Sequence, residues 1–317
     1  MILRSLLFTP GNSMRMIDKA SRLETDAVIL DLEDAVPVLG KETARIFVRD
    51  VVDKKRGDFE EPFPHLKSRE GLYICVRINS LPSGLYLDDL ASVVVDGLDG
   101  VMVPKVESEQ DVKTIEKLLG EREETIGLEK GGINIIPLIE TAKGVLNVRE
   151  IVTASERVIA LGFGAVDFAA DAHIAPSRER IELLYPRSYL SLVAHACGVQ
   201  PIDTPWVDIQ DRAGFIEDCE KAKRLGFTGK MAVHPTQLRT INQVFSPSKS
   251  EVDYARKVVE AFNKAASAGV GATFLGGKMI DLANLRQAKE VLRLAEEAER
   301  GRASGRNLRR QHPATSA

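Results

Sequence analysis

Short apolar runs alternate with longer amphipathic stretches along most of the 317-residue chain. The runs are near-continuously apolar and rich in β-branched residues, which is typical of strands buried on both faces. We expect eight such strands, at Ser5–Thr9, Ala27–Asp31, Tyr73–Ile78, Gly100–Pro104, Asn134–Ile139, Val158–Gly162, Gln200–Asp203 and Gly229–His234.

Between these strands, apolar residues recur at helical spacing. The expected helices are Ser13–Glu24, Lys41–Asp53, Leu85–Asp96, Glu107–Leu119, Thr141–Thr153, Arg178–Cys197 and Asp211–Leu225. Strands that alternate with helices predict an α/β protein whose parallel sheet is covered by the helices. Eight such units in this length favour a (β/α)8 TIM barrel over an open doubly wound sheet.

The pattern also predicts the domain organisation. Residues 1–245 would form the barrel, and the charged, proline-containing segment 54–71 would be a surface insert. Residues 246–299 contain two further helices, joined by a glycine-bounded connection that suggests a hinge and a movable helical cap. The alternative is a helical pair packed permanently on the barrel. Residues 300–317 read as a disordered basic tail.

Composition narrows the class of protein. Hydrophobic residues make up 44% and charged residues 28%, which fits a globular protein with an ample core. The net charge of −3 gives no reason to expect a nucleic-acid or membrane partner. The N-terminal apolar run is too short for a signal peptide, no apolar stretch is long enough to span a bilayer, and the three cysteines lack zinc or redox spacing. We therefore expect a cytoplasmic protein.

Polar residues cluster where the expected strands end, which is the face that carries the active site in such barrels. Glu140 and Asp167 are two acids at strand ends, and such a pair favours Mg²⁺ ligation, with water and substrate completing the shell. Either acid alone would more often cap a helix or form an ion pair. Arg77 ends another strand and invites a clamp on a substrate carboxylate, with a buried ion pair as the competing interpretation.

Other residues near the expected rim are less decisive. Glu33, in Asp31-Leu32-Glu33-Asp34, would bind a second metal, hold metal-coordinated water or cap a turn. Lys105 and Lys230 are Schiff-base candidates in principle, but a carboxylate-rich site favours structural ion pairs for both. His234 is either a general acid or base or a histidine hydrogen-bonded below the rim.

A glycine-rich stretch precedes Asp167. It lacks the third glycine of a dinucleotide-binding fingerprint. We expect it instead to let backbone approach a bound substrate, which makes Gly164 and Ala165 candidate substrate contacts.

Taken together, these motifs resemble the citrate lyase β-subunit-like branch of the HpcH/HpaI aldolase superfamily, which includes malyl-CoA and citramalyl-CoA lyases. The resemblance extends from Arg4 to about Glu299. The matching segments are Arg4–Gly11, Ile29–Val36, Val76–Asn79, Val103–Lys105, Ile139–Thr141, Gly162–Asp167, Gly229–Pro235 and Lys278–Asp281.

The resemblance implies roles for individual residues. It implies that Glu140 and Asp167 hold Mg²⁺, that Arg77 contacts the keto-acid portion of the substrate, and that Glu33 lies near metal-bound water. It implies further that Asp281 lies on a C-terminal segment that closes over a neighbouring subunit's site, in a homotrimer or a larger assembly of trimers. Lys19 and Arg22 would meet the phosphates of coenzyme A.

The expected reaction is reversible cleavage of a 3-hydroxy-carboxyacyl-CoA thioester into acetyl-CoA and a 2-keto acid, with Asp281 as general acid and Arg77 stabilising negative charge. Three alternatives stay open. They are a citrate lyase β subunit that acts on an acyl-carrier-protein thioester within a complex, a CoA-independent hydroxy-keto-acid aldolase, and a non-catalytic accessory protein.

Overall fold

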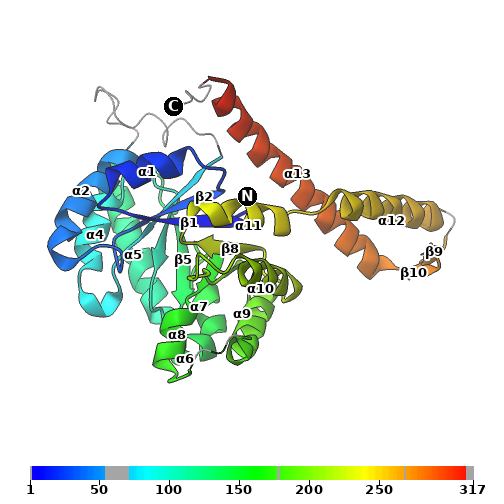
Figure 1. Cartoon of the computed structure of the whole chain (residues 1–317), viewed down its shortest axis with the longest axis horizontal. Helices are drawn as coiled ribbons and strands as arrows, with labels where there is room; N and C mark the ends of the chain where they lie inside the picture. Colours follow the sequence, from blue (N-terminus) through cyan, green and yellow to red (C-terminus); the bar gives the residue numbers. More distant parts are fainter. Residues whose placement is uncertain (1, 54–70, 176, 178, 268, 312–317) are drawn as a thin grey trace. The chain divides into compact units, whose positions relative to one another are not determined.

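The computed structural model describes residues 2–53, 71–175, 177, 179–267 and 269–311 (Figure 1). Apart from Gly71, the insert expected at 54–71 lies outside these residues. The chain forms two compact units, one spanning Leu3–Asn242 and the other containing the segment from Gln243 onward.

The first unit is a closed barrel of eight parallel strands in sequence order, with β8 pairing to β1. This confirms the expected TIM barrel. The strands are β1 Ser5–Pro10, β2 Ala27–Asp31, β3 Tyr73–Arg77, β4 Gly100–Val103, β5 Asn134–Ile139, β6 Ala160–Phe163, β7 Gln200–Asp203 and β8 Gly229–Ala232.

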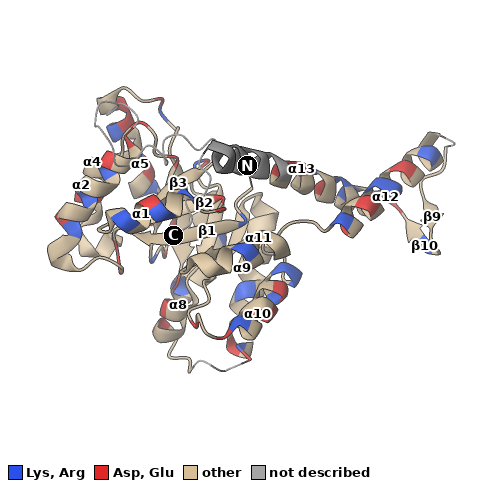
Figure 2. Cartoon of the chain, turned by 45° about the horizontal axis from the view of Figure 1, so that its top comes forward, with Lys and Arg blue, Asp and Glu red and all other residues tan. Residues whose placement is uncertain are grey.

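Helices surround the barrel on its outer face (Figure 1), and their lysine, arginine, aspartate and glutamate residues are seen in Figure 2. The helices are α1 Met14–Ser21, α2 Lys41–Val52, α4 Tyr86–Val93, α5 Glu109–Ile126, α6 Ala142–Leu146, α7 Val148–Thr153, α8 Ala165–Asp171, α9 Leu184–Cys197, α10 Arg212–Arg224 and α11 Leu238–Val244. Short 3₁₀ turns lie at η1 Val38–Gly40, η2 Leu81–Ser83, η3 Ile181–Leu183 and η4 Pro235–Gln237.

The helices differ from the sequence-based expectation at several points, and α11 is one that was not expected. The helix expected over Thr141–Thr153 is split into α6 and α7 at Asn147, whose side chain donates a hydrogen bond to the carbonyl of Glu107. The helix expected from Arg178 begins only at Leu184, after the turn η3. Helix α8 was not expected, and it places Asp167 in a first helical turn rather than in a loop.

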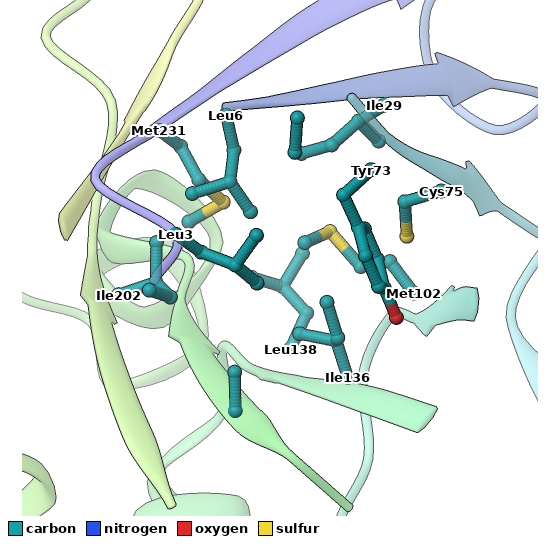
Figure 3. Packing of buried hydrophobic residues seen from close by; sticks show 12 residues of the cluster. Leu3, Leu6, Ile29, Tyr73, Cys75, Met102, Ile136, Leu138, Ile202 and Met231 are labelled. Carbon is teal, nitrogen blue, oxygen red and sulfur yellow. The ribbon is translucent and has the colours of Figure 1, made fainter. Parts of the chain in front are cut away.

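The barrel interior is a packed apolar core (Figure 3). Side chains from several strands point towards one another there and exclude water, among them Leu6, Ile29, Met102, Ile136 and Met231. Gly229 allows β8 to lie against the start of β1, because a Cβ at this position would stand 2.0 Å from the carbonyl oxygen of Leu3. The packed interior leaves the strand ends and the loops that follow them as the place for polar chemistry.

The second unit contains α12 Lys249–Ser267, β9 Thr273–Leu275, β10 Lys278–Ile280 and α13 Leu282–Gln311. Ala255, Val258, Ile280 and Ala288 form its small core. The connection expected as a glycine hinge contains an antiparallel hairpin, with Gly276 and Gly277 at positive φ in its turn. The α13 backbone is helical beyond Glu299, where the sequence analysis placed a disordered tail.

Within the residues that the structure describes, none of the helices combines the length and the apolar character needed to cross a bilayer.

Candidate active site

Arg77 and Asp31 end adjacent strands and are register partners, so their side chains meet at the rim. The guanidinium pairs with Asp31 in bidentate fashion, with Nε–Oδ1 at 2.8 Å and Nη2–Oδ2 at 2.7 Å. This is the ion pair that the sequence offered as the competing interpretation. The third nitrogen, Nη1, lies 3.0 Å from Oε2 of Glu33 and 3.4 Å from Oδ2 of Asp34, so the outer side of the fork still faces other acids.

Glu33 is buried between two cations. Its Oε1 accepts a 3.0 Å hydrogen bond from Nζ of Lys105, and its Oε2 lies beside Arg77 without a hydrogen-bonding geometry. Lys41 fixes the loop that carries Glu33, because its ammonium donates to the carbonyls of Leu32 and Glu33, both at 2.6 Å. Burial is the largest influence on Glu33 and raises the pKa of its carboxyl.

Glu140 follows β5 and is 2% exposed. Its Oε1 accepts a 2.8 Å hydrogen bond from the backbone N–H of Lys105. Its Oε2 packs against the backbone at Gly164, where an added Cβ would stand only 2.4 Å away. The glycine expected to let backbone approach a substrate therefore makes room for this carboxylate.

The charge on Glu140 is poorly compensated. Burial, followed by repulsion from Glu33 and Asp167, raises the pKa of Glu140 to about 8. Asp167, in the first turn of α8, is held loosely, with its Oδ1 3.9 Å from Nζ of Lys105. A carboxylate whose ionised form is opposed by neighbouring acids is a group that a divalent cation would stabilise strongly.

The donor set fits Mg²⁺. Arg77 pairs with Asp31 and Glu33, and the ammonium of Lys105 pairs with Glu33 and Asp167, whereas Glu140 accepts a hydrogen bond from the backbone N–H of Lys105. Among the described residues, no group of three His, Cys, Asp or Glu side chains converges on one point as a metal site. A pair of carboxylates with open positions suits Mg²⁺, which keeps several water or substrate oxygens.

A cavity of about 420 Å³ opens beside these side chains. Its lining includes Arg77, Glu140, Gly164, Ala165 and Asp167. The backbone N–H of Gly164 donates to the carbonyl of Ile139, and that of Ala165 donates to Oγ1 of Thr204. Gly164 and Ala165 therefore line the cavity but have no backbone N–H left for a ligand.

A second cavity of about 380 Å³ adjoins the first and shares Phe8, Thr9, Met16 and Val233 with it. Arg15, Lys19 and His234 lie along this second cavity. Arg22 is not among its lining residues and instead pairs with Asp18 at 2.8 Å. Of the two residues expected to meet coenzyme A phosphates, the structure thus places Lys19 beside a cavity and Arg22 in a surface ion pair.

Two polar strand residues point away from this site. Asp203 of β7 and Lys230 of β8 form a buried ion-pair group with Arg187 of α9 and Asp218 of α10. Asp203 ends an expected strand, and the polar residues at strand ends were expected to cluster at the rim. That expectation was wrong for Asp203, because its carboxylate faces the surrounding helices. The structural ion pair expected for Lys230 is present.

Asp281 belongs to the C-terminal unit, where its Oδ1 caps the start of α13 by accepting from the backbone N–H groups of Ala283 and Asn284. Its catalytic role stays a prediction.

His234 caps the turn η4, and its Nδ1 lies 2.8 Å from Oγ1 of Thr236.

Lys105 lies closer to the site than its sequence context predicted. The expected ion pair is present, but it lies inside the site and contacts Glu33 and Asp167. Lys105 also has φ = 52°, a left-handed conformation that is uncommon for lysine. The one sequence signal was its place directly after a strand end and Pro104.

Comparisons with known proteins show which family the chain resembles in sequence. The family model of HpcH/HpaI aldolase/citrate lyase matches residues 4–235. Citrate lyase subunit beta of Escherichia coli K12 is 36% identical over 293 residues, covering 92% of this chain and 93% of that protein. Human mitochondrial citramalyl-CoA lyase is 32% identical over 303 residues, covering 92% and 85%.

A solved structure supports the same assignment. The CitE protein of Mycobacterium tuberculosis, in complex with magnesium, acetoacetate and coenzyme A, superposes with a TM-score of 0.72 at 28% identity, covering 93% of this chain and 98% of that one. The chain therefore belongs to the HpcH/HpaI aldolase/citrate lyase family and is a carbon–carbon lyase.

Proposed function

We propose that this chain catalyses the reversible, Mg²⁺-dependent cleavage of a 3-hydroxy-carboxyacyl-CoA of the malyl-CoA or citramalyl-CoA type. The products would be acetyl-CoA and a 2-keto acid, glyoxylate or pyruvate. The observation that carries the proposal is the incompletely neutralised carboxylate group of Glu33, Glu140 and Asp167, beside Arg77 and next to a cavity of small-molecule size.

Glu140 and Asp167 are the proposed ligands of the metal. When bound there, Mg²⁺ would lower the pKa of the substrate hydroxyl and stabilise the negative charge of the emerging keto acid. Arg77 would present Nη1 to the substrate carboxylate, while Asp31 holds the other two nitrogens in place. The Asp31–Arg77 pair thus orients the guanidinium before the substrate arrives.

Proton transfer needs an acceptor and a donor. Glu33 is the proposed acceptor of the hydroxyl proton, and its raised pKa makes it a stronger base than an exposed glutamate. Because it does not line the cavity, it would act through a water molecule. As the carbon–carbon bond breaks, its electron pair passes to the thioester as an enolate, which Asp281 would protonate.

Asp281 would come from a neighbouring subunit in a homotrimer or in an assembly of trimers. The hairpin β9–β10 immediately precedes Asp281 and gives this segment a defined structure from which to present the carboxylate.

The cysteines Cys75, Cys197 and Cys219 are free, which fits a reducing compartment, and we place the reaction in the cytoplasm.

The coenzyme A arm would extend from the first cavity into the second. The two cavities share part of their lining, and Arg15 and Lys19 give the second one positive charge. Phosphate groups on the arm would pair with these side chains. A free hydroxy-keto acid would leave this second cavity without a function.

A second candidate is a citrate lyase β subunit that acts on a citryl thioester of an acyl carrier protein. The 36% identity to citrate lyase subunit beta favours it. The two candidates are separated by offering the purified chain either citramalyl-CoA and malyl-CoA or the citryl thioester of an acyl carrier protein. Cleavage of a CoA ester by the chain alone supports the main proposal, whereas turnover of only the carrier-protein thioester overturns it.

A further inference from the structure

Lys105 has a backbone conformation that a lysine adopts only when its surroundings demand it. It follows β4 and Pro104, with φ = 52°. A non-glycine residue is disfavoured in this left-handed region and persists there only where tertiary contacts over-determine it. The contacts of Lys105 identify what holds it there.

One residue contacts three acids from three segments of the barrel. The backbone N–H of Lys105 donates to Oε1 of Glu140 at 2.8 Å. Its Nζ lies 3.0 Å from Oε1 of Glu33 and 3.9 Å from Oδ1 of Asp167. The left-handed backbone thus lets the amide and the ammonium of the same residue serve the same site.

The ammonium also has a distinctive place in the charge balance. Within the described part of the chain, Glu33 has ion pairs to both Arg77 and Lys105, whereas the ion pair of Asp167 is to Lys105. The Lys105 side chain is 35% exposed, and that of Asp167 is 44% exposed. Both side chains can therefore move when another cation approaches.

We infer that Lys105 is a positioning residue that sets the metal affinity of the site, an inference that rests on the proposed function. Its amide orients Glu140, and its ammonium supplies positive charge to Glu33 and Asp167 before a metal binds. A divalent cation bound by Glu140 and Asp167 would replace the ammonium of Lys105 as the partner of Asp167. The ammonium would then remain paired with Glu33. Lys105 therefore stabilises the metal-free protein and weakens metal binding.

The test is the Mg²⁺ dissociation constant of the full chain, measured by calorimetry at pH 8.0 and fixed ionic strength. Lys105→Met keeps the backbone amide and removes the charge, so the constant should fall about tenfold as the competing cation is lost. Lys105→Arg should stay near wild type. Lys143→Met is the matched control, because Lys143 pairs with Glu107 outside the site, and its constant should not change.

The second readout is the melting temperature without metal, which should be lower in Lys105→Met than in Lys143→Met. A merely structural lysine would lower both stability and Mg²⁺ affinity. Unchanged or weaker Mg²⁺ binding by Lys105→Met, in a chain whose wild type binds Mg²⁺, overturns this inference alone. A wild-type chain that binds no Mg²⁺ overturns it together with the proposed function.

Discussion

The backbone N–H of Lys105 donates a 2.8 Å hydrogen bond to Oε1 of Glu140, so the end of β4 orients the carboxylate that follows β5. The other oxygen of the same carboxylate lies against Gly164, which precedes α8. Three successive strand ends of the barrel therefore determine where Glu140 points. This is the kind of preorganisation that a metal ligand on a barrel rim requires.

Asp167→Asn should remove metal binding without unfolding the chain. The side chain is 44% exposed and its contact with Lys105 is long, so the change costs little stability. We expect Mg²⁺ affinity to fall at least a hundredfold and Mg²⁺-dependent turnover to be lost, while the melting temperature stays within a few degrees of wild type. Calorimetry measures the Mg²⁺ affinity, and thermal melts measure the stability. Retained Mg²⁺ affinity would remove Asp167 from the ligand set.

Metal binding should depend on pH through Glu140. The folded protein raises the pKa of this acid to about 8 from its ordinary value of 4.5, so the folded state holds a proton that the unfolded chain releases between these values. The stability of the metal-free protein should therefore fall as pH rises from about 4.5 to 8. Mg²⁺ needs the ionised form, so its affinity should rise by up to about tenfold per pH unit and level off near pH 8.

The control for this dependence is Glu140→Gln, which has no proton to lose. Its metal-free stability should be flatter over the same pH range, as measured by urea denaturation. An equally steep fall in stability in the glutamine variant would assign the effect to another group.

Gly164→Ala should disturb the site by a steric clash, without removing any polar group. The added Cβ would stand 2.4 Å from Oε2 of Glu140, so the carboxylate must shift. We expect Mg²⁺ affinity to fall about tenfold or more, because metal ligation is sensitive to ligand position. Gly40→Ala is the matched control, since its Cβ would meet its nearest neighbour at 3.5 Å, and it should bind Mg²⁺ like wild type.

Asp281→Asn separates catalysis from helix capping. Asparagine caps a helix as well as aspartate does, so the start of α13 should keep its structure while the carboxylate is lost. The variant should bind a CoA ester normally and lose turnover by at least a hundredfold. Asp281→Ala should in addition lower stability by about 1 kcal/mol. Normal turnover by the asparagine variant would remove Asp281 from the mechanism.

The barrel was predictable because its strands are short, apolar on both faces and separated by helices, a pattern that is typical of this architecture. The sequence did not reveal on which side of its strand a charged side chain lies. Asp203 and Lys230 sit on strands like the site residues do, but their side chains reach outward to Arg187 and Asp218. In a strand buried on both faces, the apolar pattern does not reveal which side a charged residue takes.

Other parts of the structure were hidden for different reasons. Helix α8 is only seven residues long, too short for a periodic signal. The left-handed backbone of Lys105 has no sequence signature, because glycine or asparagine would be expected there. The hairpin at Gly276-Gly277 did have a sequence signature, a glycine pair between two short apolar segments, but glycines in a connection are typical of a hinge as well as of a hairpin turn.

The most direct test of the central claim is acetyl-CoA release from malyl-CoA and citramalyl-CoA by the purified chain alone, first with Mg²⁺ and then with EDTA. The proposed site predicts release with Mg²⁺, its loss in EDTA and its recovery when Mg²⁺ is restored. Release that continues undiminished in EDTA, or no release from either ester with Mg²⁺ present, would contradict a Mg²⁺-dependent CoA lyase built on Glu140 and Asp167.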